Sequence, residues 1–489
     1  MTTLPVVGDT VLNFVNGSWR EPDSGRWTQR YDPADRNVLV AQAPDSTRVD
    51  AAAAIESAFD GQDAWSATPP PVRGRLLMNW LGWIDGHRSE LATLLTREEG
   101  KTLDESLGEV TRARDILEYT AGMGRRLTGS VLPSDDADVF CYSSPQPLGV
   151  VGLISPWNFP VAIPVWKMAP ALIAGNTVVL KPSPLTPLTA TALVHGLEAA
   201  GVPKGVVNLI HGDSEPGIEL TSNPKVKGLS FTGSTKVGSV VARAASERFL
   251  KVQLELGGKN PQIVLDDADL ELAVAGVVAG AFGSTGQRCT ATSRAIVTSP
   301  NYDKFLAAVI DRASKMRVGP GVERGVEMGP LVDGKALESV ARFSESARAE
   351  GARFHIGGQR LSGSAYDRGF FFSPTVVEAT PEMAVAKEEV FGPVLSVIRA
   401  RDLDDALTIA NSVRYGLTAS IFTRDLSRCF QFASRVQAGI VHVNRPGVGG
   451  YSHAPFGGIK DSGYGGREVG NEVLNFYTET KMVYINHGS

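Results

Sequence analysis

Cysteine and histidine are scarce in this chain. Its 489 residues include three cysteines and seven histidines. So sparse and odd a set of cysteines is not typical of a disulfide framework, and we interpret Cys141 and Cys429 as ordinary structural residues. No His-x-x-x-His or Cys-x-x-Cys pattern occurs, so the sequence predicts no metal site.

A surplus of positive charge and long apolar runs are also missing. Lysine and arginine total 48 against 53 acidic residues, which gives a net charge of −5. Because nothing is left to neutralise phosphates, we expect neither nucleic acid nor a membrane surface as a partner. The start of the chain lacks the charged and apolar regions of a signal peptide, and no apolar run approaches the roughly 18 residues of a spanning helix. These features predict a cytoplasmic protein.

The composition is that of a globular protein with ample core. Hydrophobic residues make up 43% of the chain, and the length suggests about three domains. Alanine-rich amphipathic patterns predict helices over 51–65 and 72–97, separated by a turn at the prolines 69–71, and we expect them to cover the outside of a sheet. The turn-rich stretch 129–147 has alternating patches and predicts an excursion of two strands.

Strand-like and helical patterns then alternate along the chain. Apolar runs predict strands over 149–154, 177–180, 206–210 and 228–231, with helical segments such as 187–200 between them. This alternation favours a parallel, doubly wound sheet. A second α/β region follows, with a helix predicted over 269–282, a strand over 295–298 and a helix over 302–317.

One cysteine and one glutamate offer chemistry. Cys289 lies in Gly-Gln-Arg-Cys-Thr, and Glu255 precedes it in Leu-Glu-Leu-Gly-Gly-Lys. A cysteine is nucleophilic when cationic or backbone N–H groups stabilise its thiolate, and the adjacent Arg288 suits that need. An arbitrary cysteine is more often a small buried hydrophobe, so the decision depends on the other motifs.

Four motifs together resemble the NAD(P)-dependent aldehyde dehydrogenase superfamily. Besides the Glu255 run with the Cys289 run, they are Pro-Trp-Asn-Phe-Pro at 156–160, Phe-Thr-Gly-Ser-Thr at 231–235 and Glu-Glu-Val-Phe-Gly-Pro at 388–393. The resemblance extends from roughly Asn13 to the C-terminus. It implies an α/β fold with a Rossmann-type cofactor domain, an α/β catalytic domain and a small β oligomerisation element. The domains implied are a dinucleotide-binding domain (1–123 and 148–257), a catalytic domain (258–460) and an oligomerisation element (124–147 and 470–489).

The strand over 228–231, Gly233 and the helix predicted over 234–245 form a candidate phosphate site. A glycine lets a phosphate approach the backbone, and the helix N-terminus stabilises its charge. Alone the pattern is weak, because it matches neither Gly-x-Gly-x-x-Gly nor a P-loop and also suits an ordinary strand-to-helix turn. The resemblance implies that it binds the pyrophosphate of NAD or NADP, with cofactor contacts from Ile154, Ser155, Pro156, Trp157, Lys181, Ser183, Gly212, Phe231, Thr232, Gly233, Ser234, Leu256, Gly257, Glu389 and Phe391.

The choice between the two dinucleotides stays open. By resemblance, Lys181 contacts the adenine-side ribose and Glu389 the nicotinamide-side ribose, although both also suit a solvated surface. Members that prefer NAD often carry a glutamate three positions after that lysine, where this chain has Pro184. NADP is therefore not repelled, and Ser183 is placed to help hold a phosphate.

The resemblance also implies a mechanism. The Cys289 thiolate attacks the aldehyde carbon, and the Asn158 amide and the Cys289 backbone N–H hold the oxyanion. The adduct gives its hydride to the nicotinamide, and Glu255 takes a proton from the water that hydrolyses the resulting thioester to a carboxylic acid. Lys167 assists proton transfer or orients Asn158. The plainer alternatives are a turn role for Asn158 and a structural role for Lys167.

Positions that match the family's substrate tunnel are mostly aromatic or apolar. They are Phe159, Ile163, Trp166, Arg288, Thr290, Tyr451, His453 and Phe456. Such residues usually form core, but beside the catalytic motifs they favour a tunnel for an uncharged chain or ring. Succinate-semialdehyde dehydrogenases commonly carry an arginine where Trp166 stands, which puts a carboxylate clamp there in doubt. The segments 163–170 and 286–294 are most similar to 2-oxoglutarate-semialdehyde dehydrogenases, in which case Arg288 meets an acidic substrate.

Three alternatives remain for the function. The first is a broad aliphatic or aromatic aldehyde dehydrogenase. The second is a dinucleotide-binding protein without activity, which should lack the nucleophile or the base. The third, an acylating enzyme that uses coenzyme A, usually lacks the glutamate that is present here as Glu255.

The strand-like tail over 475–486 invites pairing with another chain. In the family, this tail and the excursion over 129–147 form the oligomerisation element. The resemblance therefore implies a homodimer or homotetramer.

Overall fold

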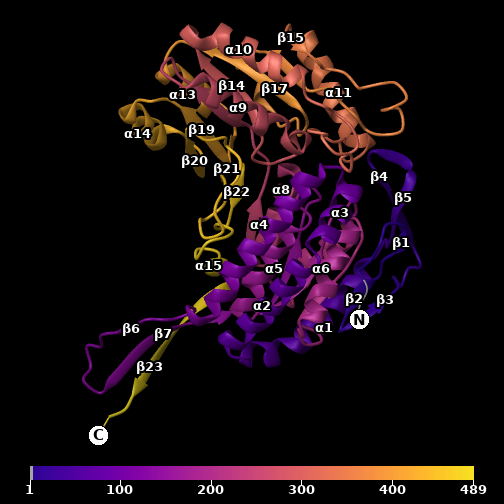
Figure 1. Ribbon diagram of the computed structural model, residues 1–489. Coiled ribbons are helices and arrows are strands. Elements are labelled where there is room, and N and C mark those ends of the chain that lie inside the picture. The colour runs from indigo at the N-terminus through magenta and orange to yellow at the C-terminus, as the bar shows by residue number, and fades with distance from the viewer. Residues whose placement is uncertain (1–3, 489) are drawn as a thin grey trace.

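An eight-stranded sheet organises the first half of the chain (Figure 1). The computed structural model describes residues 4–488. The strand order is β22-β12-β11-β8-β9-β10-β2-β3, and the neighbours from β12 to β10 pair in parallel. The bounds are β2(Asn13–Val15), β3(Ser18–Arg20), β8(Val150–Ile154), β9(Thr177–Lys181), β10(Val207–Leu209), β11(Val226–Thr232), β12(Lys251–Glu255) and β22(Gly463–Tyr464).

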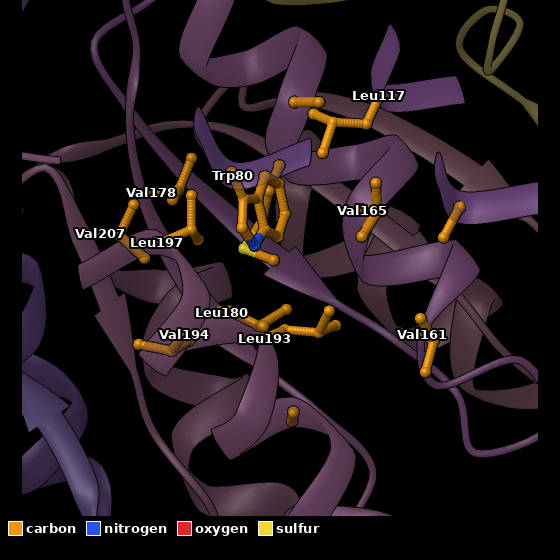
Figure 2. Close-up of a cluster of buried hydrophobic side chains, with 14 of the residues drawn as sticks. Trp80, Leu117, Val161, Val165, Val178, Leu180, Leu193, Val194, Leu197 and Val207 are labelled. Carbon is orange, nitrogen blue, oxygen red and sulfur yellow. The ribbon is translucent and has the colours of Figure 1, made fainter. Parts of the chain in front are cut away.

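Helices cover both faces of this sheet, because successive residues of its strands point to opposite sides. Val151 packs in the core under α2 to α6, whereas its neighbour Val150 packs under α1, α7 and α8. Figure 2 shows side chains of the first core, among them those of Trp80, Val165 and Val178. The helices are α1(Arg48–Ala67), α2(Pro70–Gly86), α3(Arg88–Glu99), α4(Leu103–Ala121), α5(Ala162–Ala174), α6(Pro187–Ala199), α7(Ser214–Ser222) and α8(Thr235–Ser246).

A seven-stranded sheet organises the second half. Its order is β15-β16-β17-β14-β13-β19-β20, and every neighbouring pair except β15 with β16 is parallel. One face packs on α9 and α10 and the other on α11, α13 and α14. The bounds are β13(Asn260–Val264), β14(Thr292–Thr298), β15(Arg353–Ile356), β16(Thr375–Glu378), β17(Val394–Ala400), β19(Thr418–Phe422), β20(Ile440–Val443), α9(Leu270–Phe282), α10(Ser299–Ser314), α11(Gly334–Ala349), α13(Leu403–Asn411) and α14(Leu426–Arg435).

A narrow arm projects from the body and carries the C-terminus at its end (Figure 1). It contains β6(Val131–Leu132), β7(Val139–Pro147) and β23(Thr478–Asn486). β23 pairs with β7 of the same chain along its whole length, from Thr478 opposite Pro147 to Asn486 opposite Val139. One edge of β23 therefore pairs within its own chain, and β23 is an outer strand of this three-stranded sheet.

The remaining elements are short. β1, β4 and β5 form a sheet at the N-terminal side, and β18 pairs with β21. Their bounds, with those of the short helices, are β1(Asp9–Thr10), β4(Trp27–Asp32), β5(Asp35–Pro44), β18(Tyr415–Gly416), β21(Ile459–Lys460), η1(Gly122–Arg125), η2(Gly283–Gly286), α12(Ala384–Lys387) and α15(Leu474–Tyr477).

Two sequence-based boundaries need correction. The helix predicted over 72–97 is two helices, because the chain leaves helical geometry at His87. The prolines 69–71 are not only a turn: α2 begins at Pro70, where a ring without an N–H costs no helical hydrogen bond. The domain bounds stay a prediction, and β22 joins the first sheet from beyond both ranges predicted for the dinucleotide-binding domain.

Candidate active site

Cys289 lies in the loop between η2 and β14, against the start of β13. The Asn260 side-chain amide donates to the main-chain oxygen of Cys289 at 2.8 Å and to that of Ala291 at 2.8 Å. One buried amide thus fixes the loop at Cys289 and two residues after it. The Cys289 side chain itself is half-buried.

The surroundings of Cys289 favour its protonated form. Burial, followed by the carboxylates of Glu389 and Glu255, raises the pKa of the thiol to about 12. The expectation that Arg288 stabilises the thiolate is therefore corrected. The Arg288 guanidinium donates to Ser284 Oγ at 2.9 Å and lies 3.5 Å from the Glu105 carboxylate. Because Ser284 and Glu105 engage the Arg288 guanidinium, its charge does not serve the Cys289 sulfur. Cys289 therefore needs a base to become a nucleophile.

Asn158 connects the two halves of the site. It lies in the loop between β8 and α5, and its side chain is buried. Its amide donates to the main-chain oxygen of Gln287 at 3.0 Å, in the loop that carries Cys289. An amide nitrogen has two hydrogens, so a second N–H can meet a bound group.

Glu255, at the end of β12, is the predicted base. Its side chain is buried, and within residues 4–488 neither carboxylate oxygen has a donor in good hydrogen-bond geometry. Burial first, and the nearby Glu468 second, raise the pKa of Glu255 well above its ordinary value. A carboxylate with a raised pKa binds a proton more readily than an exposed one, which suits a general base.

Lys167 contacts Glu468 and not Asn158. Its ammonium, fully buried in α5, forms an ion pair with the Glu468 carboxylate and donates to Ser230 Oγ at 2.7 Å. Of the two roles predicted for Lys167, its contacts favour proton transfer over the orientation of Asn158.

The sequence reasoning missed Glu468, and it also missed Lys101 and Glu109. Lys101 donates to the main-chain oxygen of Asn158 at 2.6 Å and to Glu109 at 2.7 Å. All three side chains are buried. No local pattern marks them, since each is one of several charged residues in its segment. Their burial is what distinguishes them from other charged residues, and the burial of a charged side chain cannot be predicted from the sequence.

The predicted phosphate-binding residues lie together at the carboxyl ends of neighbouring strands of the first sheet. β8, β9 and β11 are neighbours, and Ile154, Lys181 and Thr232 stand at their carboxyl ends. Ser234 caps α8 by accepting the Val237 N–H at 3.3 Å. In open α/β sheets this carboxyl edge is where ligands bind.

Unused polar groups at this edge suit a dinucleotide. The hydroxyls of Ser155, Thr232 and Thr235 are buried and have no hydrogen-bond partner in the part of the chain that the structure describes. Buried hydroxyls normally have partners, so these three mark places for groups that the protein does not supply. Ribose hydroxyls and phosphate oxygens fit that need.

The other predicted cofactor residues of this region have mixed surroundings. Burial lowers the pKa of Lys181 to about 8, and its ammonium donates to the oxygen of Pro182 at 3.1 Å. The Ser183 hydroxyl is already engaged, because it accepts the Leu185 N–H at 3.2 Å. Gly212 follows β10, and Phe231 is buried in β11.

Glu389 and Phe391 lie on the opposite side, beside the Cys289 loop. Glu389 accepts the Gly258 N–H at 2.9 Å, and burial raises its pKa to about 7. A Cβ at Gly257 would overlap the Glu389 carboxylate, so the close approach requires glycine there. The Phe391 ring packs edge-on against Trp157 with ring centroids 5.5 Å apart. Pro156, next to Trp157, and Leu256, next to Gly257, complete the predicted set.

Four predicted tunnel residues form one apolar cluster. Ile163 and Trp166 are buried together, and Phe159 and Phe456 pack against them, with Trp166 and Phe456 ring centroids 5.4 Å apart. Tyr451 lies outside this cluster: 57% of its surface is exposed, and it stacks on His453 at 5.5 Å. Thr290 is half-buried directly after Cys289.

Arg288 reaches from the Cys289 loop into a cavity of about 680 Å³. Glu105, Gly283, Val448 and residues of α9 and α10 also line this cavity. The guanidinium occupies the space that a side chain at position 283 would need, since a Cβ there would lie 3.2 Å from it. Arg288 is thus a charged group held by Glu105 at the wall of an open space.

Comparison with known proteins gives the same picture. The model of the aldehyde dehydrogenase family matches residues 19–483. An alpha-ketoglutaric semialdehyde dehydrogenase of Bacillus subtilis is 43% identical over 98% of either chain. A 2,5-dioxopentanoate dehydrogenase of Saccharolobus solfataricus is 44% identical over 94% of this chain and 96% of that protein. The structure of a Staphylococcus aureus betaine aldehyde dehydrogenase in complex with NAD+ superposes with a TM-score of 0.95 at 34% identity, over 98% of this chain and 95% of that one.

No helix among residues 4–488 is both long and apolar enough to cross a membrane.

Proposed function

The chain belongs to the aldehyde dehydrogenase family, and from that premise we propose that it oxidises an acid-bearing semialdehyde, with 2-oxoglutarate semialdehyde as the first candidate. It is an NAD(P)-dependent aldehyde dehydrogenase that produces a carboxylic acid. The single observation that carries the substrate class is the placement of Arg288, which directly precedes Cys289 and whose guanidinium lies 6.0 Å from the centre of the Phe159 ring. A guanidinium there can meet a carboxylate at the far end of a short substrate.

Cys289 is the proposed nucleophile. Its thiol transfers a proton to a base and its sulfur attacks the aldehyde carbon, which forms a thiohemiacetal. The carbonyl oxygen gains negative charge in this step. The second N–H of the Asn158 amide and the Cys289 backbone N–H are the donors proposed to hold it.

The dinucleotide is proposed to bind across the edge formed by β8, β9 and β11. Ser155, Thr232 and Ser234 would hold its phosphates, with Lys181 on the adenine side and Glu389 on the nicotinamide side. When bound, the dinucleotide accepts the hydride that leaves the substrate carbon. The protein's task is to orient the Cys289 adduct and to exclude water until the thioester has formed.

Glu255 then activates the water that hydrolyses the thioester. It accepts a proton from that water, and its raised pKa makes it a better base than an exposed carboxylate would be. Glu468, paired with Lys167, is proposed to take the proton onward. Hydrolysis releases the carboxylic acid and the Cys289 thiolate, which takes up one proton to return to the thiol.

The relatives support the acidic substrate over the broader alternative. Both curated relatives above are named for the same molecule, since 2,5-dioxopentanoate is the semialdehyde of 2-oxoglutarate. The apolar cluster around Trp166 favours the alternative, a neutral aliphatic or aromatic aldehyde. The non-catalytic alternative is disfavoured because Cys289, Glu255 and Asn158 are all present.

Initial rates of dinucleotide reduction test the substrate. The enzyme is assayed with NAD and with NADP against 2-oxoglutarate semialdehyde, succinate semialdehyde, hexanal and benzaldehyde. We expect the highest kcat/KM for 2-oxoglutarate semialdehyde. Equal or higher values for hexanal or benzaldehyde would support the broad enzyme, and no reduction with any aldehyde would support the binding protein.

We also propose a homodimer or homotetramer built through the arm. Its strands expose large apolar side chains, among them Val131, Phe140 and Tyr484. Leu426 and Phe430 expose further apolar surface on α14, beside β20, the last strand of the second sheet. A second copy of the chain is the proposed occupant of both surfaces, because exposed apolar patches and open strand edges favour association. Tyr484→Asp should lower the mass measured by sedimentation, and an unchanged mass would contradict a role of the arm.

A cytoplasmic location is part of the proposal. It is supported by the three cysteines, which are all free thiols in the structure, whereas secreted proteins usually pair theirs. Cell fractionation with an antibody to the chain tests it.

A further inference from the structure

Lys101 is a buried lysine outside every motif of the active site. It lies between α3 and α4, and 1% of it is exposed. Its backbone N–H donates to the Glu99 carboxylate at 2.9 Å, which fixes the turn. A buried ammonium is costly unless partners compensate it, so its contacts show what it is used for.

The two hydrogen bonds of the Lys101 ammonium lead, directly or through Glu109, to one segment. It donates to the main-chain oxygen of Asn158 at 2.6 Å and lies 4.2 Å from the centre of the Phe159 ring. Its ionic partners are Glu109 at 2.7 Å and Glu99 at 3.9 Å. The other oxygen of Glu109 accepts the N–H groups of Val161 at 2.8 Å and of Ala162 at 3.0 Å, where α5 begins.

The pair therefore fixes residues 158–162 by hydrogen bonds at both ends of the segment. Lys101 holds the carbonyl of Asn158, and Glu109 holds the N–H groups three and four residues later. Burial alone would lower the pKa of Lys101, but the Glu109 and Glu99 carboxylates outweigh it and raise the pKa above its ordinary value. The ammonium is thus charged at neutral pH, and its bonds to the segment are charge-assisted.

A buried ion pair is weak evidence for stability, because apolar residues of similar volume often stabilise a fold as well. The value of this pair lies in where it acts. The segment 158–162 contains Asn158, whose amide donates to the main-chain oxygen of Gln287 in the Cys289 loop. It also contains Phe159, which packs against the predicted tunnel residues. A small displacement of that amide would spoil the oxyanion site while the fold persisted.

We propose that Lys101, locked by Glu109, is a positioning residue that aims the Asn158 amide at the oxyanion formed on the substrate of Cys289. The inference rests on the proposed function, since it assumes that Asn158 stabilises an oxyanion. Lys101 touches neither substrate nor cofactor in this role.

A double-mutant cycle with Lys101→Met and Asn158→Ala tests the proposal. In the wild-type background, Lys101→Met should lower kcat by roughly ten- to a hundredfold, because misplacement of the donor loses catalysis. In the Asn158→Ala background the same substitution should cost less than about threefold, because the group that it positions is gone. Equal losses in both backgrounds would overturn the proposal.

Alkylation separates positioning from general damage. Iodoacetamide alkylates Cys289 by a displacement that forms no oxyanion, so its rate, followed by the mass of the Cys289 peptide, should be the same in Lys101→Met and wild type. A parallel loss of alkylation and turnover would mean a disturbed Cys289 loop and would count against the proposal.

Arg73→Met is the matched control. Arg73 is also a buried cation, and it donates to the main-chain oxygen of Ile173 at 3.0 Å, at the other end of α5. Any loss that this variant causes should add to that of Asn158→Ala. If Lys101→Met does not fold, Glu109→Gln, which keeps the shape and removes the charge, takes its place in the cycle. Wild-type enzyme without aldehyde oxidation would refute the proposed function, whereas an active enzyme with an additive cycle would refute only this inference.

Discussion

The side-chain amide of Asn158 donates to the main-chain oxygen of Gln287 at 3.0 Å, two residues before Cys289. This bond joins a loop of the first sheet to a loop of the second sheet. It uses one amide hydrogen and directs the other N–H of Asn158 away from Gln287. The oxyanion donor and the nucleophile are thereby fixed relative to each other although they belong to different halves of the chain.

Replacing Asn158 by alanine should lower kcat by roughly 10² to 10³, which is the usual cost of losing one oxyanion donor. Steady-state rates of dinucleotide reduction measure it. Asn79→Ala is the control, since Asn79 donates to the main-chain oxygen of Ala200 at the far side of the first core. A loss below about threefold for Asn158→Ala would leave Asn158 with the turn role alone.

Replacing Cys289 by alanine should abolish aldehyde oxidation and leave dinucleotide binding intact, because the nucleophile is lost while the sheet edge is unchanged. Turnover and calorimetric titration with NAD are the two measurements. Cys429→Ala, which removes another half-buried thiol, should keep both properties. Substantial oxidation by the Cys289 variant would refute the nucleophile assignment.

Replacing Glu255 by glutamine should slow thioester hydrolysis more than hydride transfer. A burst of reduced dinucleotide followed by a slow steady state is the expected trace. In the wild type, hydrolysis should become faster as pH rises through the pKa of Glu255, which burial and Glu468 place well above the ordinary 4.5, because the ionised form is the base. The glutamine variant should lose this dependence. A full steady-state rate without a burst would remove Glu255 from the mechanism.

Replacing Arg288 by methionine should raise KM for 2-oxoglutarate semialdehyde by roughly 10- to 100-fold, the cost of losing one charged hydrogen-bond partner. KM for hexanal should stay the same, because a neutral aldehyde does not use the guanidinium. Arg75→Met, an exposed arginine of α2, serves as the control. Equal changes for the acidic and the neutral aldehyde would show that Arg288 shapes the loop and does not anchor the substrate.

The affinity for NADP should fall as pH rises through about 8. Burial lowers the pKa of Lys181 to about 8, so the free protein has the ammonium below that pH and a neutral amine above it. A neutral amine no longer attracts a phosphate. Calorimetric Kd values between pH 6.5 and 9.5, chosen to span about one to two units on either side of that pKa, should show the fall for the wild type and none for Lys181→Met.

Pro184→Glu gives an independent control for the same site. A carboxylate there would repel a 2′-phosphate and accept hydrogen bonds from ribose hydroxyls, so it should shift preference from NADP towards NAD. An unchanged ratio of the two Kd values would mean that the adenine-side ribose lies elsewhere.

Local sequence was sufficient for the alternation of strands and helices in both halves. The runs at 149–154 and 177–180 are continuous and apolar, which is what strands buried on both faces require. It failed where local patterns conflict, as in the segment 72–97, whose amphipathic pattern continues past the break at His87. The strands β1 to β5 were also not predicted. β1, β2 and β3 have only two or three residues each, which carry too little periodicity.

Chemistry at Cys289, Glu255 and Asn158 could be named from the sequence because reactive groups stand in distinctive motifs. The pKa values and the ionic partners of these groups could not be predicted from the sequence. Cys289 has a raised pKa because it is buried and, secondly, because carboxylates from other elements lie near it. Arg288 pairs with Glu105 although it is the neighbour of Cys289 in sequence.

The amino-acid sequence by itself determined the family, the elements and the reactive groups, since these depend on residue types and on spacing along the chain. Only the tertiary structure decided which charges are buried and which of them meet. Lys167 and Glu468 are 301 residues apart in sequence and form one buried pair. Burial and long-range contact arise when the sheets and helices pack together, so the partners of Lys101 and Lys167 exist only in the folded chain.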